Sequence, residues 1–301
     1  MNLTATYRWG KETNSVSDLI FDKSGRFLTV AWTDGISLLD LARREEIRFH
    51  HTDELVWSVA ATLTGDRIVA GLADGTTRLW ETAGGSFLGT LSKQVGAVRS
   101  VAISPDGEFL ATGGDDAIIR QWQLPDVKPN SQPLRIMTGH TRAIYDLVYV
   151  PNSQYLISAS EDETVKLWNR ATGEMVRSFD PHFRSVVTIA ASQDGHVFAT
   201  ASWGTDVKLW RVNDGTLVRS LQAHLSGIGR GSIAFTSNSQ VLFVGTGSGA
   251  IYCWNVSDGN LQLTLTEHED ALEALALSAN DRWLASGSLD GEVILWTVAM
   301  S

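Results

Sequence analysis

One feature constrains the fold of this chain more than any other: a short run ending in tryptophan recurs along its 301 residues. The copies DGTTRLW, AIIRQW, ETVKLW, TDVKLW, GAIYCW and GEVILW end at Trp80, Trp122, Trp168, Trp210, Trp254 and Trp296. An earlier, degraded copy, DGISLLD, ends at Asp40. Successive copies lie 40, 42, 46, 42, 44 and 42 residues apart. This is the spacing of repeats that each form one four-stranded blade, and it predicts seven such units.

Each unit can be divided into four short strands. In the fourth unit, the runs AIYDLVYV, YLISAS, TVKLW and MVRSF are separated by PNSQ, EDE and NRATGE. Apolar and β-branched runs bounded by Asp, Asn, Gly and Pro are typical of antiparallel hairpins. The run ALEALAL at 271–277 has the composition of a helix, but it aligns with AIYDLVY at 143–149. We therefore predict a strand there too.

The ends of the chain predict how the blades close. A row of blades that stopped short would leave bare faces and unpaired strand edges, and a closed ring removes both. The seventh unit ends five residues after Trp296, before an outer strand could form, whereas LTATYRW at 3–9 precedes the first unit and has strand character. We predict one all-β domain over residues 1–301. It is a seven-bladed β-propeller of four-stranded antiparallel blades, closed by the N-terminal strand completing the last blade.

Composition narrows the function classes. The chain is 43% hydrophobic and 19% charged, as expected for a domain with a large core. The sequence contains no stretch of about 18 apolar residues and no apolar signal segment in MNLTATYRWGKETN, so we predict no membrane association and a cytoplasmic location. A single cysteine, Cys253, excludes an internal disulfide and fits a reducing compartment. The net charge of −10 makes nucleic-acid binding unlikely as a general property.

The repeat resembles that of the WD-repeat family of seven-bladed β-propellers, and the resemblance covers essentially the whole chain. Gly139-His140 forms the family's GH pair, and Ala223-His224 and Glu267-His268 are related pairs. The family's Trp-Asp dipeptide is absent. The repeat tryptophans are followed instead by Glu81, Gln123, Asn169, Arg211, Asn255 and Thr297.

The resemblance implies a structural role for residues that could otherwise be taken for a catalytic triad. Family members bury an Asp–His–Ser–Trp set as a hydrogen-bonded network, and buried polar groups need such partners. The two sets are His140, Ser160, Asp162 and Trp168, and then His268, Ser288, Asp290 and Trp296. Units five and six carry Gly204 and Ser248 in place of the turn aspartate, and we expect these blades to be looser.

Other local motifs carry weaker signals. GTGSGA at 245–250 resembles a phosphate-binding loop, but a strand rather than a helix follows it, so we predict a tight turn. His50-His51 and EHED at 267–270 suggest a metal site, yet adjacent histidines do not easily share one tetrahedral ion and His268 belongs to the network. We predict no metal and no cofactor, and an inert thiol at Cys253.

The proline-rich segment LPDVKPNSQP at 124–133 explains the longest interval between copies. It falls between the third and fourth strands of unit three. We predict a solvated loop on the bottom rim, with a docking element as the alternative.

The resemblance also implies where a partner would bind. Propellers of this family use exposed residues at the start of each first strand and just before the turn aspartate. Several of these positions, and some of their neighbours, carry Trp, Tyr or Arg, which are enriched at interface hot spots. The predicted partner-binding residues are Trp57, Arg99, Tyr145, Trp203, Arg142, Arg184, Glu161, Asp115 and Glu273. The alternative is that these rings merely plug the mouth of the central channel.

We therefore predict a non-catalytic scaffold or adaptor that binds a protein or peptide on the top face, as a monomer or within a hetero-complex. The arginines favour an acidic or phosphorylated partner. One alternative is a propeller enzyme with a central-channel site. That function needs inward His, Asp or Glu from several blades, whereas the first-strand positions supply mainly Ala, Ser, Gly and one Glu. Another is the recognition module of a larger multidomain protein.

Overall fold

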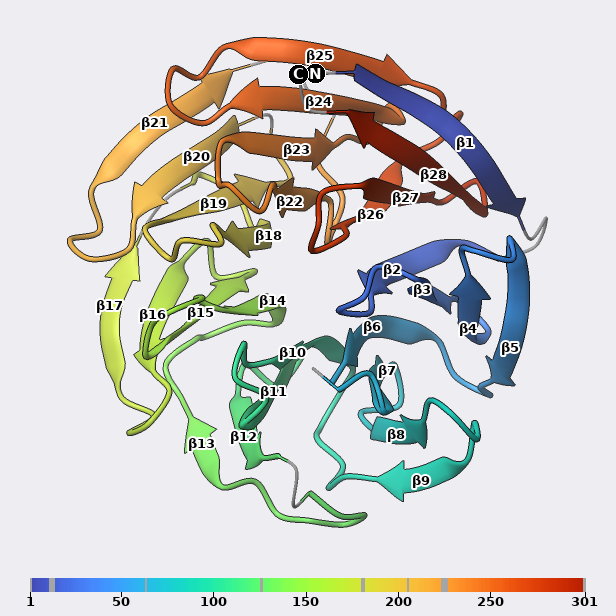
Figure 1. Cartoon of the computed structure of the whole chain (residues 1–301). Helices are drawn as coiled ribbons and strands as arrows, with labels where there is room; N and C mark the ends of the chain where they lie inside the picture. Colours follow the sequence, from blue (N-terminus) through green and yellow to red (C-terminus); the bar gives the residue numbers. More distant parts are fainter. Residues whose placement is uncertain are drawn as a thin grey trace.

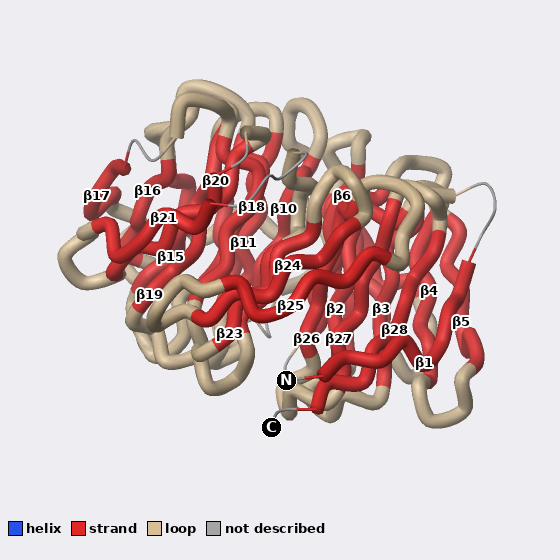
Figure 2. The backbone as a smooth tube through the Cα atoms, turned by 90° about the horizontal axis from the view of Figure 1, so that it is seen from above, coloured by secondary structure: helices blue, strands red, loops and turns tan. Residues whose placement is uncertain are grey.

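Seven antiparallel sheets of four strands surround a central channel in the computed structural model (Figure 1). The structure describes residues 2–10, 14–62, 64–124, 127–179, 182–204, 206–222 and 227–299, and these form strands, turns and loops without a helix. Viewed from the side, the strands of the blades lie between two layers of loops (Figure 2). We call the layer with the turns between the second and third strands of each blade the top face. The fold class is as predicted.

The strands of each blade follow one another outward from the channel. The first blade holds β2 (Val16–Phe21), β3 (Phe27–Trp32), β4 (Gly35–Asp40) and β5 (Glu45–His51). The second holds β6 (Val56–Ala61), β7 (Arg67–Leu72), β8 (Thr77–Glu81) and β9 (Phe87–Thr90). The third holds β10 (Val98–Ile103), β11 (Phe109–Gly114), β12 (Ile119–Gln123) and β13 (Arg135–Met137).

The remaining blades repeat this order. The fourth holds β14 (Ile144–Tyr149), β15 (Tyr155–Ser160), β16 (Val165–Asn169) and β17 (Met175–Phe179). The fifth holds β18 (Val186–Ala191), β19 (Val197–Ser202), β20 (Asp206–Arg211) and β21 (Leu217–Gln222). The sixth holds β22 (Ile233–Phe235), β23 (Val241–Gly245), β24 (Ala250–Asn255) and β25 (Leu261–Thr266). The seventh holds β26 (Leu272–Leu277), β27 (Trp283–Ser288), β28 (Glu292–Ala299) and β1 (Asn2–Gly10).

The N-terminal strand closes the ring, as the sequence predicts. β1 pairs antiparallel with β28 from Asn2 opposite Ala299 to Gly10 opposite Glu292, and Figure 1 shows the two strands side by side. Leu3 is buried in the core cluster between the sixth and seventh blades. β1 therefore gives β28 backbone partners and supplies part of the core. The predicted strand at 271–277 is confirmed as β26.

The core lies between neighbouring blades, because each sheet is covered on both faces. Strands such as β23 and β4 are accordingly buried along their whole length. Close blade-to-blade contact requires small residues on some second strands. A Cβ on Gly71 of β7 would lie 2.6 Å from Val98 Cγ1, and one on Gly287 of β27 would lie 2.3 Å from Val16 Cγ1. Larger residues there would separate the blades.

The proline-rich segment packs against the neighbouring blade, in contrast to the predicted solvated loop. Pro125 and Asp126 lie outside the described residues. The backbone N–H of Asn130 donates to the carbonyl of Thr90 on β9 at 2.8 Å, and Val127 is buried in the core cluster of the second and third blades. An apolar residue flanked by prolines gains more from covering β9 than from exposure to water. The segment thus stabilises the outer edge of the second blade.

The described residues include no helical segment of the length and apolarity needed to cross a bilayer.

Candidate functional site

The fourth blade contains a buried polar network. His140 Nδ1 lies 2.8 Å from Asp162 Oδ2, and His140 Nε2 lies 2.7 Å from Ser158 Oγ. The indole N–H of Trp168 donates to the same Ser158 oxygen at 2.8 Å. Burial lowers the pKa of His140, which favours the neutral ring. The hydrogen bonds from His140 and Thr164 outweigh burial and hold the pKa of Asp162 below its usual range. The set ties the loop before the blade to its two middle strands.

The serine of this network is Ser158, and the prediction of Ser160 in that place is wrong. Trp168 pairs with Leu156 across the ladder, and its indole leans diagonally to the residue two positions further along β15. Ser160 instead donates to the carbonyl of Ala143 at 2.9 Å and accepts the N–H of Asp162 at 3.1 Å. It therefore anchors the turn that carries the aspartate.

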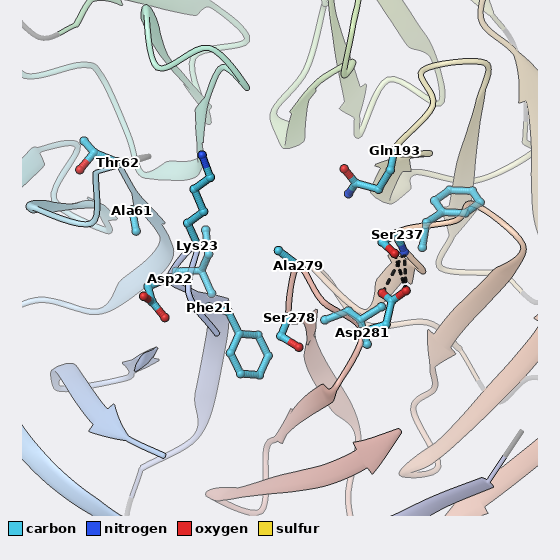
Figure 3. A pocket seen from close by; sticks show the side chains of 13 residues that line it. Phe21, Asp22, Lys23, Ala61, Thr62, Gln193, Ser237, Ser278, Ala279 and Asp281 are labelled. Carbon is cyan, nitrogen blue, oxygen red and sulfur yellow. Dashed lines mark hydrogen bonds between the residues drawn. The ribbon is translucent and has the colours of Figure 1, made fainter. Parts of the chain in front are cut away.

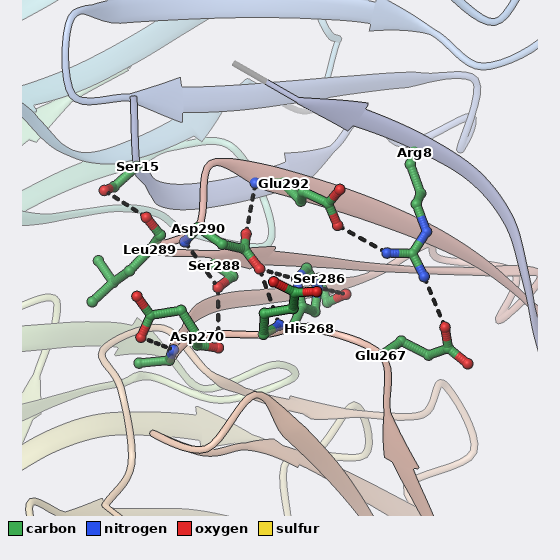
Figure 4. A network of polar contacts seen from close by, with 12 residues as sticks. Arg8, Ser15, Glu267, His268, Asp270, Ser286, Ser288, Leu289, Asp290 and Glu292 are labelled. Atoms are coloured by element: carbon green, nitrogen blue, oxygen red, sulfur yellow. Dashed lines mark hydrogen bonds and ion pairs between the residues drawn. The ribbon is translucent and has the colours of Figure 1, made fainter. Parts of the chain in front are cut away.

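The seventh blade repeats the arrangement (Figure 4). His268 contacts Asp290 at 3.2 Å and Ser286 at 2.8 Å, and Trp296 donates to Ser286 at 2.9 Å. The same correction applies, because Ser288 accepts the N–H of Asp290 at 3.2 Å rather than joining the histidine.

His268, Asp290 and Glu292 also form the one group among the described residues with potential metal-ligand spacing. The two nitrogens of His268 are taken by Asp290 and Ser286. The Glu292 carboxylate accepts from Arg8 at 2.8 Å, and Arg8 also pairs with Glu267 at 2.7 Å (Figure 4). An arginine rather than a metal thus sits against this group.

A third network in the fifth blade was missed by sequence reasoning. His182 contacts Asp206 at 2.8 Å and Thr200 at 2.9 Å, and Trp210 donates to Thr200 at 2.9 Å. The expectation that this blade lacks its aspartate is wrong, because Asp206 reaches the histidine from the position that Thr164 holds in the fourth blade. The available signal was the spacing, since His182 follows His140 by the 42 residues that separate Trp168 from Trp210.

The other blades hold their loops differently. In the third, Thr112 donates to the buried Gln94 at 3.4 Å. In the first, the Trp32 indole donates to Ser37 at 2.7 Å. In the sixth, Ser248 lies 3.1 Å from Thr246 Oγ1, and His224 of the predicted Ala223-His224 pair lies outside the described residues.

The predicted binding residues on the inner strands share one structural cause. In six blades the ladder between the inner and second strands shifts register after the first inner residue, leaving one residue unpaired. A β-bulge of this kind re-aims a side chain. The unpaired residues are Ser17, Trp57, Arg99, Tyr145, Val187 and Glu273. The bulges explain why these positions face the channel mouth.

Four side chains pack together there. The guanidinium carbons of Arg99 and Arg230 lie 4.9 and 4.7 Å from the centre of the Trp57 ring. They lie 5.4 and 5.5 Å from the centre of the Tyr145 ring. Asp115 accepts a hydrogen bond from Arg99 Nε. Tyr145 is buried and Trp57 is half-buried, so these two rings do help to close the channel.

Other predicted residues remain exposed on the top face. Trp203 lies 5.8 Å from the Tyr145 ring but keeps 55% of its surface accessible. Arg142 and Arg184 are also exposed, with Arg142 lying 3.7 Å from Glu161. Sequence reasoning missed Phe183, which is 98% exposed in the same loop as Arg184. An apolar residue directly after the network histidine is the signal that could have identified it.

The channel below the mouth holds two buried carboxylates that sequence reasoning also missed. Asp18 accepts the backbone N–H of Val59 at 2.9 Å, and Asp146 accepts that of Ile189 at 2.9 Å. Burial raises the pKa of each to about 6. Each carboxylate therefore links its inner strand to that of the next blade. The signal was a lone aspartate within an apolar first strand.

The bottom opening of the channel forms a cavity of about 440 Å³ (Figure 3). Its wall combines the aromatic rings of Phe21 and Phe235 with Lys23 and Gln193. Asp281 at the rim accepts from the backbone and hydroxyl of Ser237. None of the predicted partner-binding residues lies in this cavity.

The remaining motifs have structural positions. GTGSGA forms the turn between β23 and β24, as predicted. Cys253 is buried on β24, and burial raises the pKa of its thiol to about 12. His50 and His51 are consecutive on β5, where successive side chains point to opposite faces.

Six segments of the chain match the family described as WD domain, G-beta repeat. They cover residues 44–81, 85–123, 131–169, 173–211, 215–255 and 259–297. Each segment ends one residue after a repeat tryptophan. The chain belongs to the WD40 repeat family.

Individual relatives are more distant. A mouse subunit of chromatin assembly factor 1 is 29% identical over 160 residues, which are 44% of this chain and 28% of that protein. Chicken serine-threonine kinase receptor-associated protein is 30% identical over 173 residues, which are 56% of this chain and 48% of that protein. Protein HIR1 of Kluyveromyces lactis is 28% identical over 173 residues, 47% of this chain and 19% of that protein. The match spans less than half the length of each of these relatives.

Proposed function

We propose that this WD40 protein is a non-catalytic adaptor that binds a protein or peptide partner through the top face, within a hetero-complex. The observation that carries this proposal is the exposed aromatic and arginine cluster above the fourth and fifth blades. It comprises Trp203, Phe183, Arg142 and Arg184. Exposed large rings beside arginines are typical of interface hot spots. The names of two relatives, a chromatin assembly factor and a receptor-associated protein, support protein partners.

The polar residues favour binding over catalysis. Each histidine of the three networks has both ring nitrogens engaged by other side chains. Asp18 and Asp146 are the groups that a channel enzyme would use, because their pKa values are raised. Their oxygens accept backbone N–H groups from two blades each, and the side chains above them close the mouth. A structural role accounts for both carboxylates.

The finer features of the proposal concern chemistry and location. Arg99, Arg142 and Arg184 on the top face suit an acidic or phosphorylated partner. Asp115 and Glu161 hold two of these arginines in the absence of a partner. We also propose a cytoplasmic location, which the single buried thiol of Cys253 supports.

The test is capture of partners by the intact chain, followed by titration of the recovered partner against variants. Trp203→Ala should weaken binding by roughly 1–3 kcal/mol, the range of an interface anchor, with little change in thermal stability. Phe87→Ala is the matched control, because Phe87 is 56% exposed on the outer strand β9. If Trp203→Ala and Phe183→Ala both bind like the parent while Phe87→Ala does not, the partner uses the rim and the proposal is wrong.

A further inference from the structure

The sixth blade departs from the others at the channel mouth. Six blades place one unpaired residue at the bulge of the inner strand, but the sixth places three, Gly229, Arg230 and Gly231, between Ile228 and Ser232. A Cβ on Gly229 would lie 1.9 Å from the carbonyl oxygen of Leu272, so no larger residue fits there. Gly231 has a φ of 68°, which favours glycine. The two glycines allow the backbone to project Arg230 inward.

Arg230 crosses the channel and contacts the opposite side. Its Nη2 donates to the carbonyl of Arg99 at 2.8 Å and to that of Tyr145 at 3.3 Å. Its guanidinium lies against the rings of Trp57 and Tyr145. Arginine side chains placed this deep are nearly always paired with a carboxylate.

This arginine has no such partner. No carboxylate oxygen within ion-pairing distance of Arg230 is found among the described residues, and its Nε and Nη1 are buried without a hydrogen-bond acceptor. The indole N–H of Trp57, whose ring packs against this guanidinium, is also buried without an acceptor. Donors left unpaired in a buried site are costly and call for a missing acceptor. Burial lowers the pKa of Arg230 only to about 10, so the guanidinium stays charged at neutral pH.

We propose that Arg230 is the central residue of an oxyanion-binding subsite at the channel mouth, which receives one carboxylate or phosphate group of the partner. The free edge of the guanidinium, Nε and Nη1, matches the two-oxygen geometry of both groups. The Trp57 N–H is a further donor in the same cluster, and Trp57 and Tyr145 hold the guanidinium in place. This inference rests on the proposed function, because it assigns the acidic feature of the partner to one residue.

The test titrates the intact protein with two probes, inorganic phosphate and the peptide Gly-Gly-Glu-Gly-Gly, at low ionic strength. The readouts are isothermal titration calorimetry and the NMR signal of the Arg230 Nε–H, assigned by its loss in Arg230→Lys. At least one probe should shift this signal saturably, and the probe that does so identifies phosphate or carboxylate as the preferred group. Arg230→Met should bind that probe at least ten-fold more weakly. Arg8→Ala, which removes an arginine from the outer edge of the seventh blade, should bind like the parent.

The opposing possibility is that Arg230 is only a structural strut across the channel. In that case Arg230→Met lowers the melting temperature, while neither probe shifts the Arg230 signal in the parent, and the proposal is overturned. Equal binding by the parent and Arg230→Met overturns it as well. Because the parent signal is measured directly, the result does not depend on whether the variant folds. If a captured partner depends on Trp203 but not on Arg230, the adaptor function stands and only the subsite fails.

Discussion

The fifth and sixth blades are neighbours built from the same repeat, yet their top faces are held by different means. In the fifth, His182, Asp206, Thr200 and Trp210 link the entry loop to the two middle strands. In the sixth, Ser248 reaches only Thr246, and the inner strand β22 has three residues against six in β18. The sheet therefore tolerates loss of the network. The contrast suggests that the network fixes the top loops, whereas apolar packing between blades supports the sheet itself.

Ring closure supports both kinds of blade, and its loss should have the largest effect. Deleting residues 2–10 removes β1, exposes the edge of β28 and removes the buried Leu3. The apolar surface of Leu3 alone contributes about 2 kcal/mol, and a bare edge strand promotes aggregation. We expect aggregation or a melting temperature well below that of the parent, measured by size-exclusion chromatography and thermal unfolding. A monomer that melts like the parent would show that the clasp is dispensable.

The channel carboxylates should make stability fall as pH rises, a dependence opposite to that of the networks. The folded-state pKa of Asp18 is about 6 against an ordinary 3.8. The folded state thus retains a proton that the unfolded state releases, and stability is lost between about pH 4 and pH 6. The loss is roughly 3 kcal/mol for such a buried carboxyl. Denaturant unfolding of Asp18→Asn at pH 4.5 and pH 7 should show a smaller decrease than the parent.

The histidines of the networks act in the other direction. Burial lowers the pKa of His140 and His268, so their contribution is lost as pH falls below about 6.5, where the unfolded chain takes up protons. A parent whose stability decreased no more than that of Asp18→Asn between pH 4.5 and pH 7 would contradict the assignment to the channel carboxylates.

The contrast between the fifth and sixth blades can be tested by matched substitutions. Asp206→Ala leaves the buried His182 without its partner, and we expect a loss of about 1–3 kcal/mol in the free energy of unfolding. Asp162→Ala in the fourth blade should cost a similar amount. Ser248→Ala in the sixth blade should cost less than about 1 kcal/mol, because Ser248 is exposed. Equal losses at Asp206 and Ser248, measured by chemical denaturation, would remove the distinction between the two blades.

The smallest effect is expected at the edge of the seventh blade. Arg8 pairs with Glu267 and Glu292, but all three side chains are substantially exposed. Exposed ion pairs contribute little, so Arg8→Ala should lower stability by less than about 1 kcal/mol and less still in high salt. A loss comparable to that of Asp206→Ala would show that these pairs matter as much as a buried network.

Much of the fold could be predicted because its determinants are local and repeated. The spacing of the tryptophans defined the seven units, and the Gly, Asp and Asn turns divided each into strands. The position of 271–277 in the repeat correctly overruled its helical composition, because pairing with β27 decides the conformation. The clasp followed from counting strands at the two ends.

Only the tertiary structure decided which polar groups meet. Ser158 and Ser160 lie on the same face of β15, and the lean of the Trp168 indole selects Ser158. Asp206 reaches His182 from a position where the repeat pattern has no aspartate. Arg230 contacts residues 131 and 85 positions away, across the channel. Strand periodicity and turn chemistry are encoded within a few residues of sequence, so the sequence by itself determined the blades. Contacts at the channel mouth depend on how seven blades converge, and so they became visible only once the ring was closed.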